Sequence, residues 1–431
     1  MDRVAPASPP RADMNAGYFS SPWPAEDGGP ARHQTVHGWA LGLREGERLA
    51  CTSRPTLLST MVVLGAPGEV YLLTHSALRA HLGCPTTASV EQIDPVTLKT
   101  LKHSGPLEGG PMWPGGLAVH AHGDLIVVYG RHAHRLNRDC ERQCTRRLPE
   151  AEPYNSFVVL DNGLVVTKNL STRHPARLSV MDPVTLQAAA PDEICPEPSV
   201  ARLSAVGNTV YVVGLHRMFR YHWDEQQGRL QRDLDWDCLY LPAGDEHTHG
   251  WDVVLYAGQA WWMDNGLHRY RFRMTGAGVS PTANRLHRMP LDRQQGHTVQ
   301  TISGLPGGSI TNPPLVDPVR RIVIGYDSAN GHLQAWRWME GSQEPVLAPL
   351  WHKAPFGCAS HMLLFAATGE LVINDYRRWR EEVVVLDLET GEERARVTVG
   401  GWSQGVVFPS PGWDRDIYWS SMSRLARLHV V

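Results

Sequence analysis

The chain has 431 residues, which is longer than one hydrophobic core usually grows, so it holds either several domains or one repeat architecture. Its formal net charge is −3, from 41 basic and 44 acidic residues, and we therefore expect neither nucleic acid nor a membrane surface as a partner. Glycine (40 residues) and proline (32 residues) are frequent, which favours many short strands joined by turns.

Residues 1–46 are predicted to form a loose leader. The segment from Met1 to Pro30 is rich in Pro, Ala, Gly and Ser, and it shows no secretion signal. No window approaches ~18 consecutive apolar residues, so we expect no membrane-spanning helix. The seven cysteines are scattered and odd in number, which indicates reduced thiols and predicts a cytoplasmic location.

Residues 47–431 are predicted to form a single β-propeller domain, because one unit recurs eight times along them. Each unit is a short β-rich run, a tight turn that usually contains glycine, and a second apolar strand. The spacing of the units, about 40–60 residues, is typical of propeller blades. In chain order the units span 59–74, 115–130, 155–169, 200–214, 250–265, 311–327, 360–376 and 404–421.

The residues after each unit fit two further strands, which predicts an all-β, closed propeller of eight four-stranded blades. Seven blades remain an alternative if one strand pair is an insertion. The last unit leaves room for three strands, so residues 47–53 are expected to pair outside it and close the ring. A long stretch after the second strand of the fifth unit, residues 268–308, is interpreted as a lid or face loop.

One face of this propeller is predicted to carry the function. The turns inside the units are ordinary turn sequences. The starts of the innermost strands and the ends of the second strands share the other face, where His, Asn, Asp and aromatic residues gather. We therefore predict catalytic roles for His249, His361 and Asp252, and substrate binding by Trp113, Asn155, Trp251, Asn312, Trp402 and Gln404.

Two kinds of metal site fit this face, and both imply one divalent ion. His75, His249 and His361 could ligate a transition metal through neutral imidazole groups. Oxygen ligands from Asn155, Asn312, Asp252 and Asp264 could instead hold calcium. Alternatively, the histidines act as general acids or bases beside the substrate. No phosphate-binding glycine loop occurs, so no nucleotide cofactor is expected.

Residues 311–336, TNPPLVDPVRRIVIGYDSANGHLQAW, resemble a repeat of the propellers of the pyrroloquinoline-quinone dehydrogenase kind. The segments IDPVTLKTL, MDPVTLQAA and LDLETGEERA resemble the turn between the two outer strands in that class. The resemblance implies the propeller fold. It does not extend to the quinone, because this chain has no adjacent pair of cysteines to pack on the quinone ring.

These observations predict a cytoplasmic enzyme that acts on a small polar or cyclic metabolite in the axial mouth of the propeller. Lyase, lactonase or isomerase chemistry would suit the residues, and lactonase-like propellers offer a fold-level parallel. The alternative is a non-enzymatic propeller whose polar face docks a protein partner.

Overall fold

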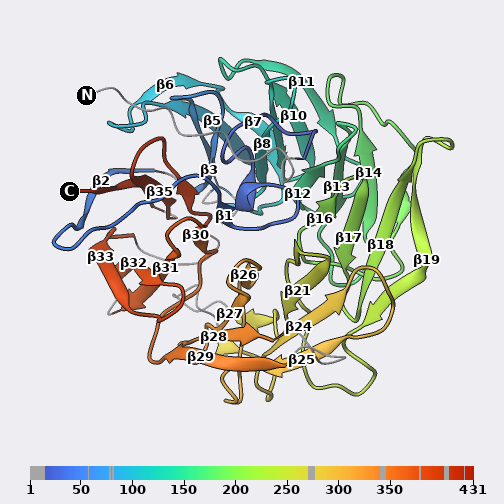
Figure 1. Ribbon diagram of the computed structural model, residues 1–431. Coiled ribbons are helices and arrows are strands. Elements are labelled where there is room, and N and C mark those ends of the chain that lie inside the picture. Colours follow the sequence, from blue (N-terminus) through green and yellow to red (C-terminus); the bar gives the residue numbers. More distant parts are fainter. Residues whose placement is uncertain are drawn as a thin grey trace.

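The computed structural model describes residues 15–56, 58–76, 79, 82–269, 277–339, 346–377, 380–401, 407–421 and 423–431. Nearly all regular structure within them is β-strand, arranged as eight four-stranded antiparallel sheets in a ring (Figure 1). The eight-bladed propeller is thus confirmed, and the seven-bladed alternative is wrong. In the part of the chain described, no helix combines the length and apolar character needed to cross a membrane.

The first four blades place their strands in chain order from the axis outwards. They contain β3 (Ser59–Leu64), β4 (Val70–His75), β5 (Thr86–Ile93) and β6 (Thr100–His103), with β7 (Leu107–Gly110) also paired to β5; then β8 (Gly116–Val119), β9 (Leu125–Tyr129), β10 (His132–Leu136) and β11 (Arg142–Arg147); then β12 (Tyr154–Val159), β13 (Val165–Asn169), β14 (Arg177–Met181) and β15 (Glu193–Ile194); and then β16 (Ser204–Val206), β17 (Thr209–Val213), β18 (Arg217–Asp224) and β19 (Arg229–Leu239).

The other four blades follow the same plan. They contain β20 (Val254–Tyr256), β21 (Gln259–Met263), β24 (Arg285–Pro290) and β25 (Thr298–Thr301); then β26 (Leu315–Asp317), β27 (Ile322–Asp327), β28 (His332–Trp338) and β29 (Leu347–Lys353); then β30 (Leu363–Phe365), β31 (Glu370–Arg377), β32 (Arg380–Asp387) and β33 (Glu393–Thr398); and finally β34 (Ser410–Pro411), β35 (Asp416–Ser420), β36 (Arg424–Val430) and β2 (Leu49–Pro55).

The last blade is closed by a strand from the other end of the chain. β2 pairs antiparallel with β36, from Leu49 opposite Val430 to Pro55 opposite Arg424. β2 therefore lies beside the last residues of the sequence in the ring (Figure 1). This confirms the closure predicted from residues 47–53, and it leaves the ring without a free gap between its first and last blades.

The turns between the two outer strands repeat the same contacts in four blades. Asp94, Asp182, Asp224 and Asp387 each accept hydrogen bonds from the backbone N–H groups two and three residues ahead. Aspartate favours such turns because its carboxylate satisfies backbone donors locally. The similarity of IDPVTLKTL, MDPVTLQAA and LDLETGEERA thus reflects one turn geometry, which supports the fold and no particular chemistry.

The stretch 268–308 differs from the lid or loop expected for it. Its described residues contain β24 and β25, which pair with each other and complete the fifth blade. A small hairpin of β22 (His268–Arg269) and β23 (Ala277–Gly278) precedes them. The long spacing arises because the hairpin is inserted between the second and third strands of this blade.

Residues 15–36, which we call the axial segment, differ most from expectation. This segment includes the 3-10 turn η2 (Glu26–Gly28) and β1 (Thr35–Val36), and it crosses the centre of the ring (Figure 1). Its backbone carbonyls accept N–H groups of five innermost strands or their ends, at Leu64, Val119, Ala205, Leu255 and Leu364. The prediction of a loose leader is therefore wrong for residues 15–36, and residues 1–14 lie outside the described part.

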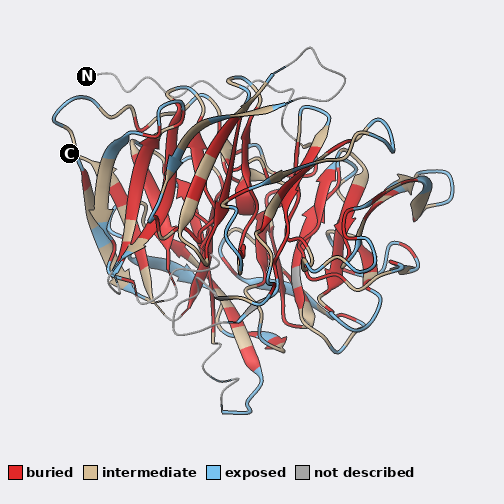
Figure 2. Ribbon diagram, turned by 90° about the horizontal axis from the view of Figure 1, so that it is seen from below, coloured by how far each residue is buried: buried red, intermediate tan, exposed pale blue. Residues whose placement is uncertain are grey.

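The physical reason is the exposed edge of each innermost strand. Such an edge presents unpaired N–H and C=O groups, and a buried group without a partner is costly. The axial segment supplies those partners and is itself buried, with Trp23, Arg32 and Gln34 exposed by 1% or less. Figure 2 shows the result: most of the strand length is buried, and exposed residues gather in the loops of both faces.

Candidate functional site

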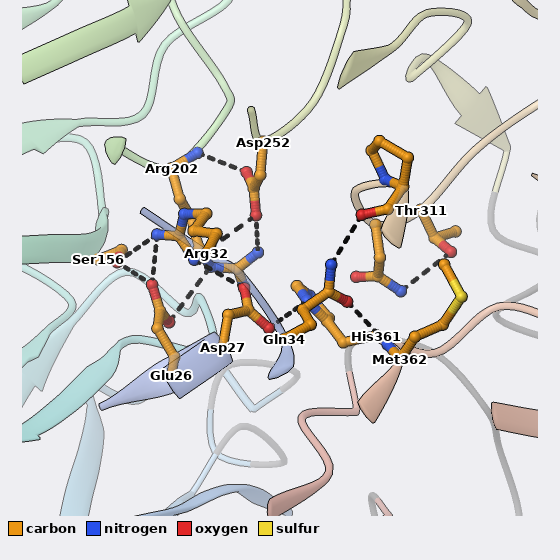
Figure 3. Close-up of polar contacts among 12 residues, drawn as sticks. Glu26, Asp27, Arg32, Gln34, Ser156, Arg202, Asp252, Thr311, His361 and Met362 are labelled. Carbon is orange, nitrogen blue, oxygen red and sulfur yellow. Dashed lines mark hydrogen bonds and ion pairs between the residues drawn. The ribbon is translucent and has the colours of Figure 1, made fainter. Parts of the chain in front are cut away.

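A cluster of buried polar side chains lies on the propeller axis where the axial segment meets the blades (Figure 3). We call it the axial cluster. It joins residues of η2 and the segment after it to the inner ends of the third, fourth, fifth and seventh blades. Its members are Glu26, Asp27, Arg32, Ser156, Arg202, Asp252 and His361, all with 5% exposure or less.

Arg32 is the centre of this cluster. Its guanidinium lies 2.5 Å from Glu26 Oε1 and 3.0 Å from Asp27 Oδ2. It also donates to the backbone carbonyl of Leu203 through Nε at 3.0 Å and a terminal nitrogen at 2.9 Å. Burial would lower the pKa of Arg32, but Glu26, Asp252 and Asp27 raise it further above its ordinary value. The arginine therefore stays charged and ties the axial segment to the fourth blade.

Arg202 and Asp252 form the second ion pair. Asp252 Oδ2 lies 3.1 Å from Arg202, and Asp252 Oδ1 accepts the backbone N–H of Arg202 at 2.7 Å. Burial would raise the pKa of Asp252, but Arg202, Arg32 and His361 together lower it to about 2. Asp252 is thus a permanent carboxylate held by two arginines, which makes it a poor general acid.

Three members of the cluster have metal-ligand chemistry. Asp27, Asp252 and His361 each place one potential ligand atom within 4.8 Å of the others. However, three carboxylates already face two guanidinium groups, so the formal charge is −1, and His361 Nδ1 lies 2.8 Å from Asp27 Oδ1. A divalent cation at this position would also face both arginines. Most of the carboxylate charge of the cluster is therefore already compensated by arginine, without a metal.

The predicted histidine ligands do not form one group. Among the described residues, neither His75 nor His249 belongs to a group of three potential ligands with His361. His75 is buried against Tyr129, with ring centroids 5.4 Å apart, and burial lowers its pKa to about 4. His249 lies near Trp251, with ring centroids 6.5 Å apart. The structure thus does not bring the three histidines together around one position.

The two aspartates of the predicted calcium set belong to different ion-pair networks. Asp264 binds Arg285 at 2.6 Å and His287 at 3.0 Å, whereas Asp252 binds Arg202. Asn312 is buried and donates its amide to the carbonyl of Ala359 and to the hydroxyl of Thr311. Asn155 lies in β12, where its backbone alone is described. The calcium set therefore stays a prediction.

Two of the three tryptophans predicted to bind substrate stack on each other in the structure. Trp113 and Trp251 stack with ring centroids 6.2 Å apart and planes 15° apart, although they come from the second and fifth blades. Trp251 is buried and donates its indole N–H to Gly266 at 2.9 Å. Trp402 and Gln404 lie outside the described residues. The face predicted to be functional thus carries a tryptophan pair near its axis.

Lys168, at the end of β13, has the most perturbed amine of the described structure. Burial lowers its pKa to about 7, with Cys195 and Asp252 acting in the opposite direction. Its Nζ donates to the carbonyl of Ser199 at 3.2 Å. Perturbed amines often mark functional sites, but Lys168 is fully buried and has no access to solvent.

A substantial cavity lies on the opposite face, among the turns inside the blades. It has a volume of about 510 Å³ and is bounded by the axial segment on one side and the third, fourth and fifth blades on the other. We call it the segment cavity. Its rim includes the exposed residues Asp161, Val206 and Ala257. Its walls include Tyr18, Phe19, Pro22, Pro24, Pro30, His33, His37, Leu255, Tyr256 and Leu291.

Sequence reasoning missed this cavity because half of its wall comes from the supposed leader. His33, His37 and the prolines were treated as parts of a loose segment. Arg202 was missed as well, although it occupies the same place in the fourth blade as Asp252 in the fifth. In each blade the residues at the start of the innermost strand face the axis, and this rule could have identified Arg202 and Ser156.

Comparison with known proteins identifies the fold of this chain but no family. No protein-family model and no curated protein sequence matches this chain. Quinohemoprotein alcohol dehydrogenase ADHIIG from Pseudomonas putida HK5 is similar in structure with a TM-score of 0.58 at 9% identity, over 97% of this chain and 80% of that one. BamB from Moraxella catarrhalis gives 0.53 at 11% identity, over 89% and 99%.

The Dos1 propeller is also similar, with a TM-score of 0.51 at 9% identity over 88% of this chain and 94% of that one. Identities this low show the fold alone. The protein is therefore an eight-bladed β-propeller whose axis is filled by its own N-terminal segment. The resemblance stated above holds at the level of the fold, without a specific family.

Proposed function

We propose that this protein binds a small molecule in the segment cavity. The observation that carries the proposal is the cavity of about 510 Å³, which lies within the range of small-molecule sites. Aromatic, proline and aliphatic side chains contribute to its walls, and a few polar groups stand among them. Ligand sites have this composition because apolar walls supply affinity and a few polar groups fix orientation.

Within this proposal, an enzymatic reaction would use the histidine and tyrosine residues of the cavity. The hydroxyl of Tyr256 lies 3.3 Å from Nε2 of His37, and the ring of Tyr256 lies 3.9 Å from that of His33. Imidazole and phenol groups transfer protons, as lyase and isomerase reactions require. These residues replace His249, His361 and Asp252 as the candidates for acid–base chemistry, because the last two are buried in the axial cluster.

The axial cluster is better explained as a structural ionic network. Its arginines and carboxylates are paired with one another, and it lies at the junction of the axial segment and four blades. A cavity of this volume also favours a small ligand over a protein partner, which would need a wide surface. A cytoplasmic location stays a prediction, supported by seven free cysteines, each in the described part of the chain.

The test is to block the cavity from its rim. Val206 is 49% exposed in the turn of the fourth blade, and Val319 is 78% exposed in the corresponding turn of the sixth blade, outside the cavity. A metabolite screen by thermal shift should find ligands that stabilise the natural protein and the V319W variant. The V206W variant should keep its melting temperature but lose the shift. A shift that survives in V206W would show that the ligand binds elsewhere.

A further inference from the structure

The charges around the segment cavity are unequal, and they indicate the class of ligand. Arg32 is the only lysine or arginine in the described wall, and it is 1% exposed and paired with Glu26 and Asp27. Asp161, by contrast, is exposed at the rim. An anionic ligand would therefore find a carboxylate and no available cation, which disfavours its binding.

Two further arginines lie nearby, and both have acidic partners of their own. Arg138 stands 5.4 Å from the ring centroid of Phe19 but binds Glu69 at 2.6 Å. Arg220 donates to the carbonyl of Leu291 at 2.6 Å and is paired with Asp233 at 2.5 Å. Neither arginine belongs to the wall of the cavity. Their charge is compensated locally, so they do not make the cavity cationic.

Asp161 is held in place at the rim by two hydrogen bonds. Its Oδ1 accepts the backbone N–H of Ala16 at 3.2 Å, across the mouth of the cavity. Its own backbone N–H donates to Gly207, which joins the turns of the third and fourth blades at the rim. The carboxylate is thus fixed beside the opening, at the position where a ligand would enter.

Three phenyl or phenol rings contribute to the wall of the cavity. Tyr18, Phe19 and Tyr256 come from the axial segment and the fifth blade, and they stand on different sides of the same space. The faces of aromatic rings attract cations, and flat rings stack on one another. Aromatic rings together with one carboxylate are suited to bind a protonated amine that carries an aromatic ring.

We propose that the ligand of the segment cavity is a cationic amine that carries a planar aromatic ring, with Asp161 as the partner of the ammonium group. This inference rests on the proposed function, since it names the ligand of the same cavity. Asp161 acts as a specificity-determining residue, and the aromatic walls supply most of the affinity.

Three probes with the same ring test this proposal: tryptamine, indole and indole-3-acetate, which carry a positive charge, no charge and a negative charge. Binding is measured by isothermal titration calorimetry at low ionic strength, because salt screens an exposed ion pair. We expect tryptamine to bind about fivefold more tightly than indole, and indole-3-acetate to bind most weakly, as an exposed charge pair is worth about 1 kcal/mol.

Two variants separate this inference from the proposed function. D161N keeps an oxygen for the N–H of Ala16 and should remove the preference for tryptamine without changing the affinity for indole. D139N, at an exposed aspartate outside the cavity, should change neither value. Equal binding of the three probes, lost in V206W, would overturn the ligand class and leave the proposed function intact. Failure of all three probes to bind, or binding unaffected by V206W, would overturn the inference.

Discussion

Buried charges in this protein fall into two kinds at the scale of single residues. Those of the axial cluster are paired, and the pairing lowers the pKa of Asp252 to about 2 in spite of burial. Glu381, in β32, has no such partner: no described side-chain nitrogen forms an ion pair or a hydrogen bond of good geometry with it. Burial raises its pKa to about 8, with a smaller opposite effect of Trp419. The charged form of the Asp252 carboxylate is thus stabilised by arginines, whereas burial disfavours the charged form of the Glu381 carboxylate.

Glu381 makes the stability of the protein depend on pH. Its pKa is raised from 4.5 in the unfolded chain to about 8 in the folded protein. Between these values the folded state binds more protons, so the contribution of this group to the free energy of unfolding is lost as the pH rises from 4.5 to 8. E381Q has no proton to lose, and it should gain on the order of 3 kcal/mol over the natural protein between pH 5 and pH 8.

Urea unfolding at pH 5 and pH 8 measures this gain. E389Q serves as the control, because Glu389 lies on the surface and its exposed ion pairs contribute little. If E381Q and the natural protein lost stability in parallel between the two pH values, Glu381 would be ionised in the folded state.

Part of the axial cluster could be found from the sequence, and the reason is geometric. Asp252 and His361 follow from the rule that the start of each innermost strand faces the axis. Glu26, Asp27 and Arg32 could not be found in this way, because they lie in a segment without strand periodicity. Their position depends on carboxylates and backbone groups of distant blades, and a sequence pattern carries no record of those pairings.

The axial segment is the element that changes the interpretation of the fold. It contacts the blades through backbone hydrogen bonds as well as through side chains such as those of Trp23, Arg32 and Gln34, and its backbone contacts require no alternation of apolar and polar residues. Its richness in proline and glycine is compatible with an irregular path around the axis and was read as disorder. The strands of the blades, in contrast, were predictable because apolar residues and turn signals alternate along them.

Gln34 provides the test at this scale. Its side-chain amide donates to the carbonyl of Pro314 at 2.8 Å, and its side-chain oxygen accepts the backbone N–H of Met362 at 2.8 Å. Q34A leaves both buried backbone groups without a partner, and each such group costs about 1–3 kcal/mol. We expect Q34A to lower the free energy of unfolding by about 3 kcal/mol.

Chemical denaturation followed by circular dichroism measures the change. Q143A, in the exposed outer strand β11, should cost less than about 0.5 kcal/mol. A similarly small cost for Q34A would mean that the two side-chain hydrogen bonds of Gln34 do not hold the axial segment against the blades.

At the scale of the whole molecule, β2 closes the ring in the last blade, and the axial segment connects the blades at the centre. Open repeat arrays contact only their neighbours and can unfold in steps. Here the axial segment forms hydrogen bonds with the inner strands of distant blades. A blade that unfolds therefore also disturbs the segment that holds the other blades. We expect unfolding in one cooperative transition in spite of the 431 residues.

Tryptophan fluorescence and far-ultraviolet circular dichroism should therefore give the same midpoint in urea, and calorimetry should show one peak. The 15 tryptophans are spread over most blades, which makes fluorescence a report on the whole ring. Separate midpoints for the two signals would indicate that groups of blades unfold independently.

The pairing of β2 with β36 and of β1 with β30 also has a consequence for the order of events during protein synthesis. Thr35 pairs opposite Leu364, and Leu49 opposite Val430, so these early segments find their partners only after the seventh and eighth blades have been synthesised. Until then the edges of the strands that they pair with in the folded ring are missing, and unpaired strand edges promote aggregation. We therefore expect the nascent chain to be most prone to aggregation before these two blades are complete.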